Sequence, residues 1–162
     1  MPATTDVYLG NPNLKKAGTE LQFTKKQVEE WIKCKNDPLY FACNYMQIIN
    51  LDEGLVPFDM YDFQKEILMD FHENRFNIAK LPRQTGKSTT VVAYLLHYAI
   101  FNDSVNIGIL ANKASTAREL LGRLQLAYEN LPKWIQHGIL VWNKGNVELE
   151  NGSKIRLLLH LQ

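Results

Sequence analysis

A short stretch near the middle of the chain carries the residue types that bind phosphate. Residues 82–89 have the sequence Pro-Arg-Gln-Thr-Gly-Lys-Ser-Thr and match the end of the motif Gly-x-x-x-x-Gly-Lys-Ser/Thr, with Leu81 at the position of its first glycine. In that motif the second glycine lets the backbone approach an anion, the lysine reaches the β- and γ-phosphates, and the hydroxyl binds Mg²⁺. We therefore predict a nucleotide-phosphate loop with Ser88 as the metal ligand. The predicted binding residues are Arg83, Gln84, Thr85, Gly86, Lys87, Ser88 and Thr89.

Arg83 is an unusual member of such a loop, and two interpretations of it stay open. It is either a solvated arginine, free or paired with a local carboxylate, or a cation directed at the γ-phosphate, as arginine fingers are. Because the second interpretation gives it a role in phosphoryl transfer, Arg83 and Lys87 are the catalytic candidates.

The pair Phe63 and Gln64, which precedes the loop, is a second candidate for ligand binding. A glutamine amide offers both a donor and acceptors, which matches the N6 and N7 edge of adenine, and an aromatic neighbour can stack or pack there. Taken alone, Gln64 would be interpreted as an exposed glutamine on a helix.

The first part of the chain is expected to be helical after an irregular lead-in over residues 1–23. Thr24 and Gln27 have the spacing of a capping box, and Asp37 stands before a proline as the N-cap of a second helix. A loop then leads to a third helix at about residues 60–73, defined by its apolar spacing.

The loop itself lies within a pattern of alternating strands and helices. A strand, the loop, a helix and a strand in succession make a βαβ unit, which indicates an α/β fold with a parallel sheet. The expected elements are a strand over residues 76–81, a helix over 87–101, a strand over 105–110, a helix that begins with a capping box of Thr116 and Glu119, and a β-hairpin around Asn151-Gly152.

Composition and charge exclude several classes of function. Eighteen lysines and arginines stand against 17 acidic residues, a net charge of +1, so the chain lacks the positive charge of a protein that coats nucleic acid. Cys34 and Cys43 make neither a disulfide framework nor a metal-binding pair, which favours a reducing compartment. The most apolar run, residues 91–101, is too short to span a bilayer, and no signal peptide is recognisable, so we expect no membrane association.

Two patterns that imitate functional sites are set aside. Residues 46–53 end in Asp-Glu, like the metal-binding strand of many ATPases, but they precede the phosphate loop and are interrupted by Gln47 and Asn50. We interpret them as a helix end and a solvated turn. The four histidines lack metal-ligand spacing and are interpreted as core or surface residues.

Five stretches of sequence resemble those of one protein family, and they have that family's order and spacing. They are Phe63-Gln64-Lys65, RQTGKST at residues 83–89, GILANKASTARELL at 108–121, LPKW at 131–134 and WNKGNVELENGSKI at 142–155. Over about residues 25–155 the chain resembles the ATPase half of the large terminase subunits of tailed bacteriophages, of the myovirus type found in cyanophages. An arginine-containing loop without the first glycine is the norm in that family, so Leu81 and Arg83 agree with the resemblance.

The resemblance implies a function and a set of partners. It implies a P-loop ATPase that uses ATP and Mg²⁺, with Phe63 and Gln64 as its adenine-recognition motif. The full-length protein would be a motor that moves double-stranded DNA into a procapsid, with an endonuclease domain after the ATPase. The implied partners are double-stranded DNA, the portal protein, on which the subunits form an oligomer, and the small terminase subunit. The implied location is the host cytoplasm, outside the finished virion.

The expected architecture is an α/β fold: a partial P-loop NTPase core with a parallel sheet, preceded by a helical segment and ending in a β-hairpin. Its expected divisions are the lead-in of residues 1–23, a helical segment with the adenine motif over 24–75, the partial ATPase core over 76–155, and a divergent tail over 156–162.

The chain departs from the family pattern at this tail. The family continues after the hairpin into a small-residue segment ending in Arg-Gly, and then into a strand whose Asp orders Mg²⁺ and whose Glu activates water; these 162 residues contain neither. If the leucine codons of residues 157–159 are CTG-CTG-CTN, another reading frame encodes alanines there. We therefore hypothesise a truncated terminase that is out of frame from about residue 156, and we expect this chain alone to bind ATP without hydrolysing it.

Two other interpretations stay open. One is an ATPase fragment of a superfamily-2-type helicase, which shares the glutamine motif and the loop. The other is a non-catalytic truncated remnant with an unfinished sheet, without function or acting as an assembly competitor. A small-molecule kinase fits less well, because the phosphate loop begins about 80 residues into the chain and no lid-type arginine cluster follows.

Overall fold

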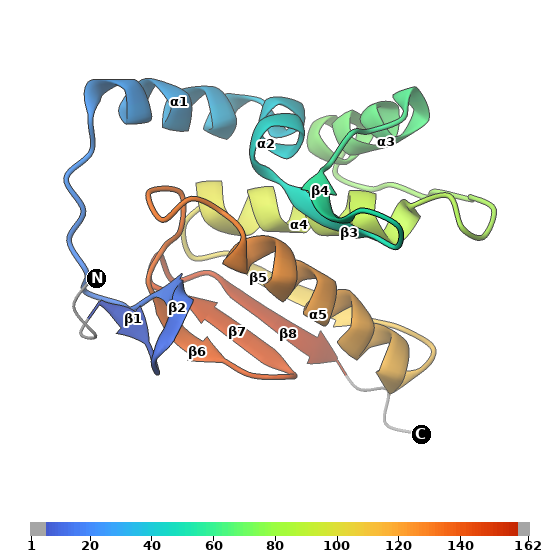
Figure 1. Ribbon diagram of the computed structural model, residues 1–162. Helices are drawn as coiled ribbons and strands as arrows, with labels where there is room; N and C mark the ends of the chain where they lie inside the picture. Colours follow the sequence, from blue (N-terminus) through green and yellow to red (C-terminus); the bar gives the residue numbers. More distant parts are fainter. Residues whose placement is uncertain (1–5, 159–162) are drawn as a thin grey trace.

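The computed structural model describes residues 6–158, which form eight strands and five helices (Figure 1). In chain order these elements are β1 (Val7–Tyr8), β2 (Asn11–Lys15), α1 (Lys25–Asn36), α2 (Pro38–Tyr45), β3 (Gln47–Asn50), β4 (Gly54–Pro57), α3 (Asp62–Glu73), α4 (Lys87–Phe101), β5 (Asn106–Leu110), α5 (Ala114–Glu129), β6 (Ile139–Trp142), β7 (Asn146–Leu149) and β8 (Lys154–Leu158).

The main sheet is mixed rather than parallel. Its four strands have the order β5-β8-β7-β6, and among these described strands only β5 and β8 pair in parallel. β1 with β2, and β3 with β4, form separate antiparallel pairs. The α/β class is confirmed, but the expected parallel core is limited to one pair of strands. The reason is that short turns join β6, β7 and β8, and a parallel neighbour would need a long crossover connection instead.

Local chemistry sets the starts of the first two helices. The Thr24 hydroxyl accepts a hydrogen bond from the Gln27 N–H, and the Gln27 side chain accepts one from the Thr24 N–H, which completes the capping box of α1. The Asp37 carboxylate accepts from two backbone N–H groups in the first turn of α2. Both predicted start signals are confirmed. α5 begins earlier than expected and without a side-chain cap, so the predicted capping box of Thr116 and Glu119 is not formed.

α4 runs through the centre of the molecule, between the N-terminal helices and the sheet (Figure 1). It contacts α2, α3 and α5, and α5 packs in turn on β5 and β8. Leu96 and Ile100 of α4 are buried in one hydrophobic core with Phe41 of α2, Leu68 of α3 and Ile155 of β8. No helix in the described part of the chain is long and apolar enough to cross a membrane.

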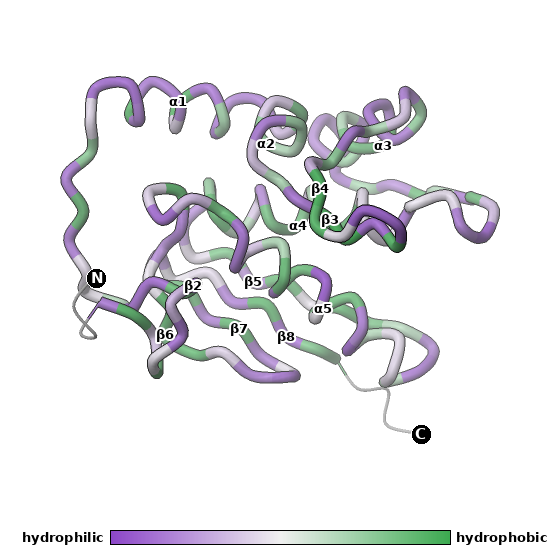
Figure 2. Tube along the Cα trace, in the orientation of Figure 1, coloured by the Kyte–Doolittle hydropathy of each residue, from purple (hydrophilic) through white to green (hydrophobic). Residues whose placement is uncertain are grey.

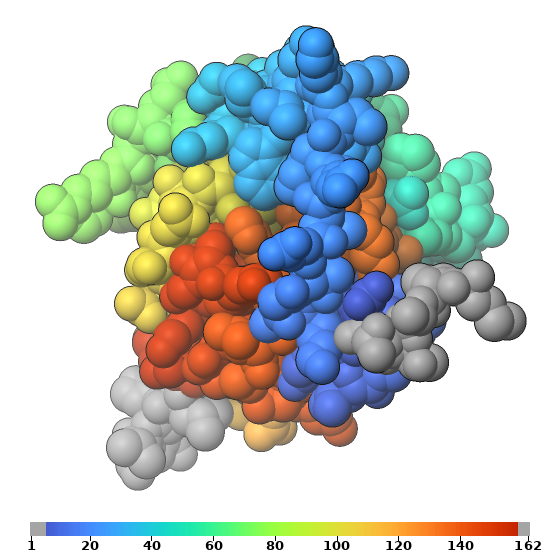
Figure 3. Space-filling model, turned by 90° about the vertical axis from the view of Figure 1, so that its left-hand side faces the viewer, coloured from blue at the N-terminus to red at the C-terminus, as the bar shows by residue number. Residues whose placement is uncertain are grey.

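The lead-in is more ordered than expected, because it forms β1 and β2. Lys16 then makes a parallel bridge to Ile139 at the edge of the main sheet. The Glu150 carboxylate accepts hydrogen bonds from the N–H groups of Gly18, at 2.9 Å, and Gly138, at 3.2 Å. Figure 3 shows this segment running over the side of the molecule from α1 down to β1 and β2. Within the described part of the lead-in, the prediction of irregular structure was therefore wrong for β1 and β2, which pair with each other as a short antiparallel hairpin. The contacts of Lys16 and Gly18 could not be predicted locally, because their partners lie more than a hundred positions away. Residues 1–5 lie outside the described residues.

The segment after α2 also differs from its prediction. Residues 46–53 contribute β3 and a turn of a β-hairpin rather than a helix end, and Ile48 of β3 pairs with Val56 of β4. The segment expected to be helical over residues 24–75 is therefore interrupted by two strands. Near the tip of this hairpin the Leu51 side chain is 99% exposed. Figure 2 shows hydrophobic and hydrophilic residues mixed along β3 and β4.

The strand expected over residues 76–81 is not formed. These residues lie in the long connection between α3 and α4, which projects from the molecule in Figure 1. Ile78 is fully exposed, at 101%. A strand is stable only when a neighbouring backbone satisfies its N–H and C=O groups, and no described strand pairs with this segment.

The turn between β7 and β8 holds the end of α4. Gly152 has a φ of +84°, as the predicted Asn-Gly turn requires. The Asn151 amide nitrogen donates to the carbonyl oxygens of Ala99, at 2.9 Å, and Asn102, at 3.1 Å. These carbonyls belong to the end of a helix, where backbone acceptors have no partner within the helix. The side chain thus links the sheet to the central helix.

Changing Asn151 to Asp is expected to lower the free energy of unfolding by about 2 kcal/mol, because a carboxylate cannot donate to these carbonyls and is repelled by the helix end. Urea denaturation measures the effect. Asn44→Asp is the matched control, since the Asn44 amide donates to the Tyr40 carbonyl within the exposed end of α2. Equal losses in the two variants would contradict the link between sheet and helix.

Candidate phosphate-binding site

The loop before α4 contains two residues in the left-handed backbone conformation. Gln84 has a φ of 62° and Gly86 a φ of 71°. The Thr85 hydroxyl, between them, donates to the Pro82 carbonyl oxygen at 3.0 Å. Glycine adopts this conformation freely, whereas a side chain at Gln84 makes it cost roughly 1–2 kcal/mol. The loop is therefore a tight and partly strained turn that leads directly into α4.

α4 starts at this loop with its first N–H groups uncapped. Gly86 is the N-cap residue and no side chain caps the helix; Lys87, Ser88 and Thr89 form its first residues. The carbonyl oxygen of Gly86 accepts from both the N–H and the hydroxyl of Thr90, at 3.0 and 3.2 Å, which fixes it to the helix. Uncapped N–H groups together with the helix dipole favour an anion at such a helix start.

The predicted binding side chains lie together but differ in exposure. Arg83, Gln84 and Lys87 are exposed, whereas Ser88 and Thr89 are partly buried. Neither basic side chain takes part in an ion pair within residues 6–158. The local carboxylate that was one option for Arg83 is therefore not found in this part of the chain. Both cations stand next to the uncapped helix start, so the site is electrostatically suited to an anion.

Gln64 lies against the loop, although it comes from α3. Its side chain is only 3% exposed, so the structure does not agree with an exposed helical glutamine. Its Oε1 accepts from the Tyr61 N–H at 2.9 Å, and its Nε2 donates to the Thr85 carbonyl oxygen at 3.2 Å. The helix start of α3 and the phosphate loop are thus joined through one amide group.

Phe63 lies on the exposed side of the same helix start. Its ring stacks on that of Tyr61, with centroids 5.9 Å apart and planes 8° from parallel. Both rings are exposed, and so they offer a flat aromatic surface of the kind on which a base stacks. Tyr61 was not among the predicted site residues. Tyr61 precedes Gln64 by three residues, which is the spacing between the N-cap of a helix and the residue that bonds back to it. The sequence did not reveal this role, because tyrosine is an unusual N-cap residue.

A cavity of about 290 Å³ lies next to the loop, between Ala79, Leu81, α3, α4, β5 and α5. Lys87 and Ser88 contribute to its wall, but most of the lining is apolar, including Phe71, Leu81 and Ile109. An apolar wall cannot compensate the charge of a phosphate that leaves water. The apolar part of this wall therefore does not suit a phosphate, whereas Lys87 and Ser88, where the cavity borders the loop, offer polar groups to one.

The donor set for a metal ion is small. Within the described residues no group of three or more His, Cys, Asp or Glu side chains could hold a metal ion. Ser88 alone offers a hydroxyl at the position that the motif reserves for Mg²⁺. A hydroxyl oxygen fits Mg²⁺, which prefers oxygen ligands and is commonly shared between one or two protein groups, water and phosphate oxygens. The arrangement thus suits a metal ion that arrives with a phosphate ligand.

Residues 78–161 match the family model described as terminase large subunit, T4likevirus-type, N-terminal. The match covers just over half of the 162 residues and contains the phosphate loop, α4, α5 and every strand of the main sheet. It also includes most of the expected tail of residues 156–162, whereas Phe63 and Gln64 lie before its first residue.

Proposed function

Because the chain belongs to the T4likevirus-type terminase large subunits, we propose that it is the ATP-binding part of a motor that packages viral DNA. In this proposal the loop of residues 82–86 and the start of α4 form a P-loop, which binds the phosphates of ATP. Mg²⁺ reaches the site with the nucleotide and is bound by Ser88.

The uncapped start of α4 behind Gly86 is the observation that carries this proposal. α1 and α2 have side chains that cap their first N–H groups. α5 also lacks a cap, but its first turn has neither the left-handed glycine nor the Lys-Ser pair that follows it in α4. Backbone N–H groups, a helix dipole and a lysine at one place are the components of phosphate binding in P-loop proteins.

Each basic side chain has a defined part in this function. Lys87 places its charge beside the terminal phosphates, and Arg83, exposed and without an ion pair in the described residues, neutralises charge on the γ-phosphate. The stacked rings of Tyr61 and Phe63 provide a surface for the base. Phosphoryl transfer depends mainly on such positioning and charge stabilisation.

For the complete family protein we propose translocation of double-stranded DNA into a procapsid, by subunits assembled on the portal protein together with the small terminase subunit in the host cytoplasm. These activities need an Asp that orders Mg²⁺ and a Glu that activates water, which the family resemblance places beyond the hairpin. For these 162 residues alone we therefore propose ATP binding with negligible hydrolysis.

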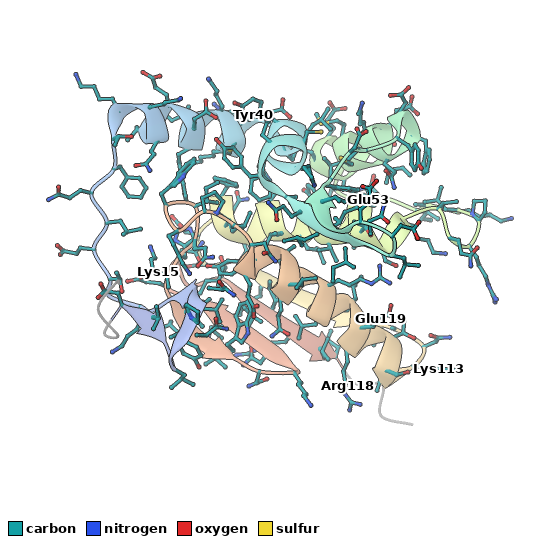
Figure 4. The ribbon with its side chains drawn as sticks, in the orientation of Figure 1. Lys15, Tyr40, Glu53, Lys113, Arg118 and Glu119 are labelled. Atoms are coloured by element: carbon teal, nitrogen blue, oxygen red, sulfur yellow. The ribbon has the colours of Figure 1, made fainter. Side chains whose placement is uncertain are left out.

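Changing Lys87 to Ala is expected to weaken the binding of a fluorescent ATP analogue with Mg²⁺ at least about tenfold, because a charge-assisted contact to phosphate is lost. Fluorescence titration measures it, with circular dichroism to verify the fold. Lys113→Ala is the matched control, since Lys113 is an exposed lysine at the uncapped start of α5 (Figure 4). Unchanged affinity in Lys87→Ala, or an equal loss in both variants, would reject the phosphate loop.

A further inference from the structure

We propose that Gln64 is a positioning residue that orients the Gly86 N–H for phosphate binding, an inference that rests on the proposed function of the loop. The Thr85 carbonyl and the Gly86 N–H belong to one planar trans peptide unit, so they point in opposite directions. The hydrogen bond from Gln64 Nε2 to the Thr85 oxygen fixes that carbonyl toward α3. The Gly86 N–H is consequently held pointing away from α3, free to donate to an anion.

The missing side chain of Gly86 is part of this arrangement. A Cβ atom at Gly86 would collide with Nε2 of Gln64, the atom that holds the Thr85 carbonyl. Gly86 also has a φ of +71°, which a side chain would disfavour. The glycine is thus needed twice, once for the backbone conformation and once for the close approach of the glutamine amide.

The other end of the amide explains why the contact is stable. Gln64 Oε1 accepts from the Tyr61 N–H at the start of α3, and the side chain is 3% exposed. A hydrogen bond between buried groups is costly to leave unmade, so the amide is held at a fixed orientation. The loop is therefore attached to the rigid end of a helix and is preorganised before any ligand arrives.

This role differs from adenine recognition. A glutamine that recognises adenine has to present its donor and its acceptor to the N6 and N7 edge of the base. In this chain both groups are bonded to the backbone, at Tyr61 and Thr85. The distinction is testable because inorganic tripolyphosphate carries the phosphates of ATP without a base.

Gln64→Met keeps the length of the side chain and removes both hydrogen-bonding groups. The dissociation constants of ATP–Mg²⁺ and of tripolyphosphate–Mg²⁺, measured by calorimetry, are each expected to rise about tenfold. Gln27→Met is the matched control: Gln27 has the same place at the start of α1, where its Oε1 accepts from the Thr24 N–H at 3.0 Å. It removes a helix cap without touching the loop, and both affinities are expected to stay at the wild-type value.

A second variant separates the two ends of the amide. Gln64→Glu retains an acceptor for the Tyr61 N–H but loses the donor to Thr85, so the cap of α3 stays while the loop is released. It is expected to weaken tripolyphosphate binding even at about 0.5 M salt, where the added charge is largely screened. If Gln64→Glu bound tripolyphosphate as tightly as the wild-type chain does at that salt concentration, the added charge alone would explain the loss at low salt, and the proposal would be overturned.

Three outcomes of these experiments have different meanings. Loss of ATP binding with unchanged tripolyphosphate binding in Gln64→Met would assign adenine recognition to Gln64 and overturn the positioning role. If Gln27→Met weakened binding as much, the effect would be a general loss of helix capping, which would also overturn the positioning role.

If the wild-type chain bound no tripolyphosphate, the proposed function would fail, while hydrogen exchange of residues 83–88 would still test the contact between Gln64 and Thr85. Faster exchange in Gln64→Met than in Gln27→Met is expected, and equal exchange would refute the contact.

Discussion

Acidification from pH 7.5 to pH 5 is expected to lower the free energy of unfolding by about 2 kcal/mol through His97 alone. Burial lowers the pKa of His97 from 6.5 to about 4, and its side chain is 2% exposed. Below pH 6.5 the unfolded chain takes up a proton at this histidine, whereas the folded chain does so only near pH 4. The stabilisation is therefore complete above pH 6.5 and is lost as the pH falls toward 4.

The surroundings of His97 explain this depressed pKa. Its Nε2 lies 2.8 Å from the carbonyl oxygen of Cys34, which can only accept, so the proton of the neutral ring is on Nε2. Its Nδ1 is buried without a hydrogen-bond partner in the described structure. The rings of Phe41 and Phe101 lie 5.7 and 4.9 Å from the imidazole. Protonation of Nδ1 would therefore create a buried charge, and this cost lowers the pKa more than the hydrogen bond to the Cys34 carbonyl and the charge of Asp37 raise it. His72 lowers the pKa of His97 further.

Urea denaturation at several pH values between 7.5 and 5 measures this effect, with His97→Gln as the comparison. Glutamine keeps a donor for the Cys34 carbonyl and does not titrate, so the free energy of unfolding of the variant is expected to depend much less on pH. A smaller pH dependence remains through His137, whose pKa is also lowered by burial. Should the variant be too unstable to compare, an NMR titration of the wild-type imidazole decides: a pKa near 6.5 for His97 would contradict the expectation.

Changing Gly86 to Ala is expected to weaken tripolyphosphate binding roughly 30- to 150-fold, because the left-handed backbone costs about 1–2 kcal/mol and the lost hydrogen bond of Gln64 about 1 kcal/mol more. Gly86 has a φ of +71°, and a Cβ atom would displace the Gln64 amide from the Thr85 carbonyl. The two penalties act on the same peptide unit, so this single methyl group has the largest expected effect on the site. Calorimetric titration with tripolyphosphate and Mg²⁺ measures it.

Gly54→Ala is the control that isolates the backbone penalty. Gly54 has a similar φ of +78°, but a Cβ there would meet no atom within 4 Å, and it is the first residue of β4, next to the turn that follows β3. This variant is expected to lose about 1–2 kcal/mol of stability and none of its affinity for tripolyphosphate. Wild-type affinity in Gly86→Ala would show that the loop tolerates a side chain and would remove the basis for its role in binding.

Local signals in the sequence determined the starts of α1 and α2, although they did not determine the start of α5. Thr24 with Gln27, and Asp37 before a proline, begin α1 and α2 as predicted. The predicted helix over residues 87–101 agrees with α4, and the predicted strand over 105–110 contains β5. These features depend on hydrogen bonds and apolar spacing within a few residues, so neighbours in the sequence suffice to specify them.

The strands were harder to predict, because a strand exists only with a partner. Residues 76–81 have the composition of a buried strand, yet they extend into solvent beside an apolar cavity, with no described strand to pair with. In contrast, residues 46–53 contain strong turn formers but still provide β3, since β4 follows at once and closes a hairpin. Backbone pairing between segments decides such cases, and propensity within one segment does not contain that information.

In the candidate site, too, the sequence indicated some features and only the tertiary structure revealed others. The sequence alone indicated Arg83, Lys87 and Ser88, which lie close together because they are contiguous in one motif. Only the tertiary structure decided that Gln64 is buried against Thr85, with both amide groups bonded to the backbone. That contact joins residues 21 positions apart and exists because α3 packs on α4. A side chain acquires such a role from the packing of helices, which depends on the whole apolar core and not on the residues next to it in the chain.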